Sequence, residues 1–231
     1  RTMNILILRA GMSDPSNSAT LAHAFAAGLQ SSGAHVETLH LKDLHLDHFD
    51  AAIHYDHPDQ CRDDFSTLAQ AVTSADGIVI ATPIWNFSVP AHLKNVIDRL
   101  GAIALDTETH SQGMLKGKPF FLIFSGGMPS PGWKGMLSLT TSHVQEAIRY
   151  FGGSTVGVHY EGRTTPARGK FGLVVDKRPA SLLELEQKGR AFAEIIDRFV
   201  RTGSLPLKQA IAHRVLTFGY ALVQKLVYTF S

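Results

Sequence analysis

Five short segments of the chain are apolar throughout or alternate between apolar and polar positions, and this pattern predicts five β-strands. The first, Met3–Leu8, is nearly continuous apolar sequence, which is typical of a strand buried on both faces of a parallel sheet. The other four cover His35–Leu41, Gly77–Ala81, Phe120–Phe124 and Ser154–Tyr160.

Helical patterns separate the strands, because apolar residues between them recur every three or four positions. The predicted helices cover Ala19–Ser31, Asp59–Ala75, Pro90–Leu100, Ser138–Phe151 and Pro179–Thr202. This alternation predicts an α/β domain with a doubly wound, five-stranded parallel sheet, helices on both faces and right-handed crossovers. We expect the domain to occupy residues 1–203.

The remaining segment, residues 204–231, is predicted to be a C-terminal amphipathic helix. It holds three basic residues and no acid, so removing its charge of +3 from the total of +2 leaves the rest of the chain at −1. Two interpretations stay open: packing on its own domain or a dimer partner, and peripheral contact with a membrane through residues 206–230. Its apolar face consists of Ile211, Val215, Phe218, Leu222, Leu226 and Phe230.

Composition narrows the class of protein. The 231 residues are 44% hydrophobic and 18% charged, as expected of a globular chain, and the small net charge gives no indication of a nucleic-acid partner. A single cysteine, Cys61, excludes an intramolecular disulfide and favours a reducing compartment. With no signal-peptide pattern at the start, we expect a cytoplasmic protein.

A stretch rich in histidine and aspartate lies between His40 and Asp59. Both residue types bind metals, but their spacing matches no recognised ligand set. A solvated loop is therefore predicted here, and no metal site.

Three loops follow the first, third and fourth predicted strands, at the sheet edge where open α/β sheets bind their ligands. Ser16-Asn17-Ser18 opens a helix, and hydroxyls beside unpaired amides suit an anion. The loop from Thr82 to Pro90 offers an aromatic plane and an amide side chain to a flat heterocycle. Ser125-Gly126-Gly127 lets the backbone approach a ligand closely.

At these loops the chain resembles the NAD(P)H-dependent FMN reductases and flavodoxin-like NAD(P)H:quinone oxidoreductases, over roughly residues 3 to 200. Two positions depart from the family pattern: Trp85 replaces the usual tyrosine, and Ala10 stands where many relatives have serine. The signature consists of Ala81-Thr82-Pro83, Asn86, Ser88-Val89-Pro90, Leu93-Lys94-Asn95 and Asp98.

The resemblance implies a flavodoxin-like fold with FMN as cofactor. Its phosphate would be held by Arg9, Ser16, Asn17 and Ser18, and its ring by Pro83, Ile84, Trp85, Asn86 and Phe87. Ser125, Gly126 and Gly127 would contact the pyrimidine side. Trp133 or Met136 could touch the substrate, and the loop cations Arg163, Arg168 and Lys170 could reach a nicotinamide phosphate, although solvated charges are the favoured interpretation.

The activity that the resemblance implies is hydride transfer from NADH or NADPH through FMN to a quinone, flavin or similar small acceptor, in a homodimer. His159, at the end of the fifth strand, is the candidate proton donor. Two alternatives stay open. One is a flavodoxin-type electron carrier without its own NAD(P)H turnover, and the other is a membrane-attached interaction protein that has lost the flavin.

Overall fold

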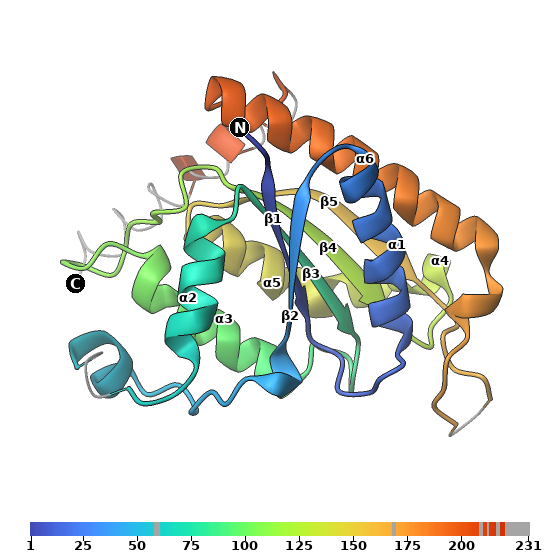
Figure 1. Cartoon of the computed structure of the whole chain (residues 1–231). Helices are drawn as coiled ribbons and strands as arrows, with labels where there is room; N and C mark the ends of the chain where they lie inside the picture. The colour runs from blue at the N-terminus through green and yellow to red at the C-terminus, as the bar shows by residue number, and fades with distance from the viewer. Residues whose placement is uncertain (58–60, 168–169, 208–209, 212, 216–217, 220–231) are drawn as a thin grey trace.

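A computed structural model of the chain describes residues 1–57, 61–167, 170–207, 210–211, 213–215 and 218–219. Within this part of the chain, five parallel strands form one sheet in the order β2-β1-β3-β4-β5 (Figure 1). Each predicted strand is confirmed to within two residues at either end. The strands are β1 (Asn4–Arg9), β2 (His35–His40), β3 (Gly77–Pro83), β4 (Pro119–Ser125) and β5 (Ser154–Glu161).

Helices cover both faces of the sheet. The side chains of α1 and α6 pack with one set of strand residues, and those of α2, α3 and α5 pack with the alternate set. In β1, for example, Ile5 and Ile7 face the first group, while Leu6 and Leu8 face the second. The helices are α1 (Asn17–Ser31), α2 (Phe65–Ser74), α3 (Ala91–Ala104), α4 (Ser130–Gly132), α5 (Ser138–Tyr150) and α6 (Pro179–Thr202).

Two glycines let α1 and α6 pack at very short range. A Cβ atom at Gly28 would lie 2.0 Å from the carbonyl oxygen of Glu186, and one at Gly189 would lie 2.2 Å from that of Phe25. Since both obstacles are backbone atoms, a side chain at either position would force the helices apart. The second half of α1 therefore lies in direct backbone contact with α6.

The prediction for α2 is wrong at its beginning. The helix starts at Phe65 rather than Asp59, because Asp63 accepts the backbone N–H of Phe65 (3.1 Å) and turns its other carboxylate oxygen toward Arg99. Asp59 itself lies outside the described residues.

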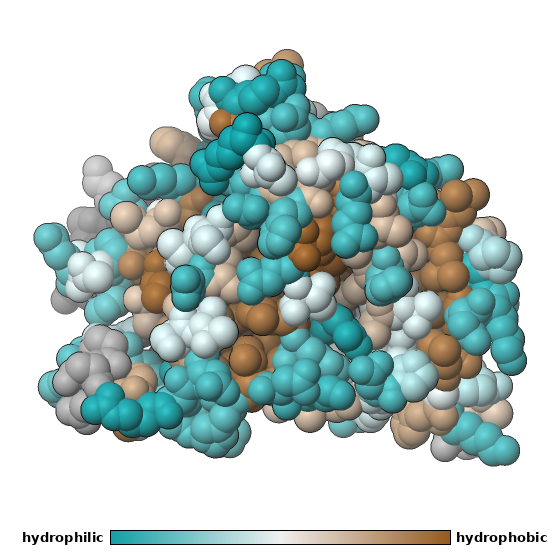
Figure 2. Space-filling model, in the orientation of Figure 1, coloured by the Kyte–Doolittle hydropathy of each residue, from teal (hydrophilic) through white to brown (hydrophobic). Residues whose placement is uncertain are grey.

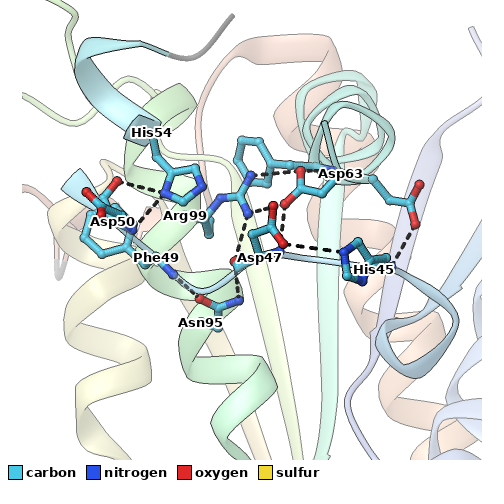
Figure 3. A network of polar contacts seen from close by, with 10 residues as sticks. His45, Asp47, Phe49, Asp50, His54, Asp63, Asn95 and Arg99 are labelled. Atoms are coloured by element: carbon cyan, nitrogen blue, oxygen red, sulfur yellow. Dashed lines mark hydrogen bonds and ion pairs between the residues drawn. The ribbon is translucent and has the colours of Figure 1, made fainter. Parts of the chain in front are cut away.

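Arg99 and Asp63 form a buried ion pair at the centre of a polar network (Figure 3). Their side chains are 0% and 1% exposed, and two hydrogen bonds of 2.5 and 3.0 Å join them. Arg99 also donates to the carbonyl oxygen of Asp47, and Asp63 accepts the N–H of that residue. Burial alone would raise the pKa of Asp63, but Arg99 and the backbone donors hold that pKa well below its usual value.

The same network holds the loop between β2 and α2, in which most of the described residues are exposed, as the sequence predicts. Asn95 of α3 accepts the N–H of Phe49 and donates to the carbonyl oxygen of Asp47, so α3 holds this segment (Figure 3). His54 is buried, stacks on Phe49 and bonds the backbone of Asp50. Across the described residues, no three metal-ligating side chains gather in one place.

Beyond α6, the described residues between 207 and 219 have helical conformation, with Ala210 donating to the carbonyl oxygen of Pro206. Leu205 is buried, but Ile211, Val215 and Phe218 are exposed, so these three residues of the apolar face do not pack on the domain. Leu222, Leu226 and Phe230 lie outside the described residues. Of the helices that the structure describes, none is long and apolar enough to cross a membrane.

Candidate functional site

A cavity of about 400 Å³ opens at the carboxyl ends of β1, β3 and β4, on the edge that the sequence indicates. The loops after these strands and the segment after β5 form its walls. The lining residues are Gly11, Met12, Ser13, Pro15, Ser16, Asn17, Ser18, Pro83, Ile84, Trp85, Asn86, Ser125, Gly126, Gly127, Thr164, Thr165, Phe171 and Gly172.

One end of the cavity is the beginning of α1. Ser16 caps the helix by accepting the N–H of Ala19 (3.1 Å), and the hydroxyl of buried Ser18 lies 3.4 Å from that of Ser16. The first-turn amides of a helix have no helical carbonyl partner. Gly11 packs closely on these serines, since a Cβ atom on it would approach Ser18 Oγ to 2.9 Å. This end offers hydroxyls and amide donors to an anion.

Asn17 lies beside these serines, but its side chain is fully used by the protein. Its amide nitrogen donates to the carbonyl oxygens of Thr164 (3.1 Å) and Gly172 (2.9 Å). Its oxygen accepts the N–H groups of Val174 and Val175. The Asn17 side chain therefore ties the segment after β5 to the start of α1.

Arg9 does not line the main cavity. It lines a neighbouring cavity of about 240 Å³ that it shares with Ser16, and it pairs with Asp14 at 3.6 Å. Its Nε is buried and finds no hydrogen-bond partner among the described residues. Ser16 lines both cavities, whereas Asn17 and Ser18 line the main one without Arg9.

Another part of the cavity wall is aromatic. Trp85 and Ser88 exchange two backbone hydrogen bonds across a tight turn whose central residues, Asn86 and Phe87, have φ angles of 48° and 68°. Phenylalanine rarely adopts this left-handed conformation, and strain of this kind clusters at functional sites. The turn leaves Trp85 44% exposed, and Phe171 stacks on it with ring centroids 5.3 Å apart.

The turn after β4 completes the wall. Ile84 donates to the carbonyl oxygen of Ser125 (2.8 Å), which joins the second and third loops. A Cβ atom at Gly126 would lie 2.8 Å from the Tyr160 hydroxyl, and one at Gly127 would lie 2.6 Å from Thr165 Oγ1. Both positions therefore need glycine, as the sequence indicates. Phe87 lines a second cavity of about 400 Å³ that shares Ile84, Asn86, Gly126 and Gly127 with the first.

Tyr160 and Trp133 support this turn from beneath. Their rings stack 4.6 Å apart, and the Tyr160 hydroxyl donates to the carbonyl oxygen of Met128. Burial and the charge of Glu161 raise the pKa of Tyr160 to about 12, so it stays protonated. Trp133 is buried and does not line the main cavity. Nothing is described of the Met136 side chain.

His159 is buried away from the cavity, beneath α6. Lys188 donates to its Nδ1 (2.9 Å), so Nε2 carries the proton and faces Glu161 (3.3 Å). Burial alone would raise the pKa of Glu161, but His159 and Arg178 lower it. The structure gives His159 a place in a buried polar network and does not bring it to the predicted flavin ligands.

Two of the loop cations, Arg163 and Lys170, are exposed and do not line the cavity. Arg168 lies outside the described residues. In contrast, the sequence interpretation missed Thr164, Thr165, Phe171 and Gly172, which do line the cavity. Their one sequence signal is their position just after the fifth strand.

The chemistry of the cavity fits FMN. Its hydroxyls and helix amides suit a phosphate, and its exposed aromatic rings suit a flat ring system. Three of its glycines pack so closely on neighbouring side chains that a Cβ atom would collide with them. The site contains ten of the twelve predicted cofactor ligands; Arg9 and Phe87 are on adjoining cavities.

Known proteins are similar to this chain in sequence. The family model for the flavodoxin-like fold matches residues 3–171. An FMN-dependent NADH:quinone oxidoreductase of Alcanivorax borkumensis is 32% identical over 142 residues, which are 54% of this chain and 71% of that protein. A protein of the same name from Thiobacillus denitrificans is 47% identical over 64 residues, 26% of this chain. The match spans just 31% of the Thiobacillus protein.

Solved structures agree in fold. An NAD(P)H:quinone oxidoreductase from Methanothermobacter marburgensis has a TM-score of 0.61 at 20% identity, covering 83% of this chain and 98% of that one. An azoreductase from Bacillus anthracis has a TM-score of 0.58 at 16% identity, covering 86% and 100%. At these identities the likeness concerns the arrangement of the backbone.

Proposed function

The chain belongs to the family of proteins with the flavodoxin-like fold, and we propose from this that it is an FMN-dependent NAD(P)H:quinone oxidoreductase. The proposed activity is the one for which the relatives are named. The observation that supports it in this chain is the cavity at the carboxyl edge of the sheet, where hydroxyls and helix amides suit the phosphate of FMN and aromatic residues suit its ring.

In this proposal the chain binds and orients a cofactor that performs the redox chemistry. FMN supplies a ring that accepts a hydride from a nicotinamide and passes electrons to an acceptor. Ser16, Ser18 and the first-turn amides of α1 would hold its phosphate. Trp85, Ile84 and Pro83 would contact the ring, and the backbone of Gly126 and Gly127 would face its pyrimidine edge.

The acceptor is a small, flat molecule such as a quinone. Phe87 and Phe171 are 65% and 77% exposed and, with Trp85 and Met12, they give the mouth of the cavity an apolar rim. Such a rim suits both an aromatic acceptor and a second subunit. We therefore propose a homodimer in which the partner covers part of this mouth.

Cys61 is unpaired in the structure, in keeping with a reducing compartment, and we propose a cytoplasmic location. The donor is NADH or NADPH. The relatives are named for NADH, so NADH is the cosubstrate to test first.

A visible spectrum of the protein with FMN, before and after anaerobic NADH or NADPH, tests the proposal. We expect a bound flavin band that bleaches with the nicotinamide and returns when a water-soluble quinone is added. A bound band that neither nucleotide bleaches would instead indicate an electron carrier. Failure to bind FMN would contradict the proposed function altogether.

A further inference from the structure

We propose that the segment after α6 binds the anionic surface of a lipid bilayer through Leu207, Ile211, Val215 and Phe218. The proposal concerns where the protein is held, and it does not depend on the reaction at the cavity.

The four side chains form one stripe. They follow each other at intervals of four, four and three residues, which places them on one face of a helix. They are 74%, 53%, 63% and 72% exposed, respectively. A surface helix of a globular protein normally turns such a face toward the core, so this arrangement is reversed.

The opposite side of the segment contacts the domain, which explains why the apolar stripe faces outward. His213 Nδ1 lies 2.7 Å from the hydroxyl of Ser154, at the start of β5, and Leu205 is buried where the chain leaves α6. Burial and the nearby charge of Arg149 lower the pKa of His213, although a bond with the backbone of Gly153 opposes them. The segment is thus attached to the domain by a polar residue, which leaves its apolar stripe facing outward.

The charge of this segment indicates which kind of partner it binds. Residues 203–231 include Lys208, Arg214 and Lys225 and no aspartate or glutamate. A symmetric pair of these segments would contain six basic residues and no acidic residue of its own to compensate them. Anionic lipid headgroups complement both the basic residues and the apolar stripe, since apolar side chains enter the boundary between headgroups and acyl chains.

The attachment point also leaves the cavity free. Ser154 begins β5, whereas the cavity lies at the carboxyl ends of the strands. Binding of the stripe to a surface therefore need not cover the cavity, and occupancy by FMN can be followed on vesicles.

The test is flotation of the 231-residue protein with vesicles of phosphatidylcholine, with and without about 30% phosphatidylglycerol. We expect binding to the anionic vesicles that weakens with salt, and binding to the zwitterionic vesicles weaker by on the order of 30-fold. Ile211→Glu and Phe218→Glu should each lower binding to the anionic vesicles at least about tenfold.

Leu139→Glu is the matched control, because Leu139 is 76% exposed on α5 and the exchange is the same. This variant should float like the unchanged protein. Circular dichroism and thermal unfolding establish that each variant is folded. The proposal is overturned if the unchanged protein does not float, or if Leu139→Glu is as defective as Phe218→Glu. It is also overturned if the stripe variants dissociate an oligomer while vesicle binding is absent, since the stripe would then contact a second copy.

Discussion

His40 and His92 donate hydrogen bonds to two consecutive carbonyl oxygens of the loop before α1, those of Gly11 (2.5 Å) and Ala10 (2.6 Å). A carbonyl oxygen only accepts, so Nε2 of each ring carries the proton. The C=O and N–H groups of a trans peptide point in opposite directions. These bonds therefore also fix the N–H groups of Gly11 and Met12, both of which line the cavity.

Replacing either histidine should loosen this loop and weaken the binding of FMN. We expect His40→Ala and His92→Ala each to raise the Kd for FMN by about three- to tenfold, the equivalent of one hydrogen bond of roughly 1 kcal/mol. Quenching of flavin fluorescence measures the Kd. His35→Ala is the control, because His35 is exposed at the far end of the strand that carries His40. An unchanged Kd in both site variants would mean that the loop holds its shape without them.

Asn17→Ala tests whether this residue ties the segment after β5 in place or contacts the cofactor. Its side chain makes four hydrogen bonds to that segment, so its loss should cost about 2 kcal/mol and lower the Tm by roughly 4–8 °C. The fluorescence of Trp85 should shift as Phe171 is released. Gln30→Ala, on the exposed end of the same helix, serves as control. A normal Tm with a large loss of FMN affinity would instead assign Asn17 to the phosphate, as the sequence indicates.

Asp63 should make stability depend on pH. Its pKa is lower in the folded state than in the unfolded chain, so its contribution is complete above about pH 5 and is lost as the pH falls below the unfolded value near 4. We expect Asp63→Asn to cost about 3–5 kcal/mol at pH 7, since it leaves Arg99 buried without a carboxylate. The difference in the free energy of unfolding between this variant and the unchanged protein should shrink as the pH falls from 5 to 3.

Urea unfolding at several pH values gives this difference directly. Asp56→Asn is a suitable comparison, because Asp56 is exposed and belongs to the same segment of the chain. A difference that stayed constant down to pH 3 would show that the Asp63 carboxylate titrates alike in both states.

His159→Gln separates a structural role from a catalytic one. Because the ring bonds Lys188 and Glu161 within a buried network, the variant should lose about 1–3 kcal/mol of stability. The rate of flavin reduction by NADH should stay within about twofold. Stopped-flow absorbance measures this rate, and a loss beyond tenfold in a stably folded variant would give His159 the proton-donating role after all.

The elements that could be predicted are those with a strong local pattern. The strands β1, β3 and β4 are almost wholly apolar, and their alternation with helices predicts the doubly wound sheet. The family follows from the resemblance of the loops after these strands. The three ligand loops could be found for the same reason, since each directly follows a strand that is easy to recognise.

What escaped prediction depends on contacts between distant residues. Phe171 enters the site only because Asn17 binds the chain on either side of it, more than 140 positions away. Arg99 is charged, yet it is buried because Asp63 meets it from another element. The exposed stripe after α6 has a normal amphipathic pattern, and only its bond to Ser154 reveals which face is turned outward.

The position of Ser154 has a consequence for the supply of substrates. The eight residues of β5 separate this anchor from the sheet edge that bears the cavity, a span of roughly 25 Å. A molecule held at a surface by its last segment would present the cavity toward the surrounding water. Its acceptors should therefore arrive from solution, and quinones with short, water-soluble side chains should be reduced faster than those dissolved in the bilayer itself.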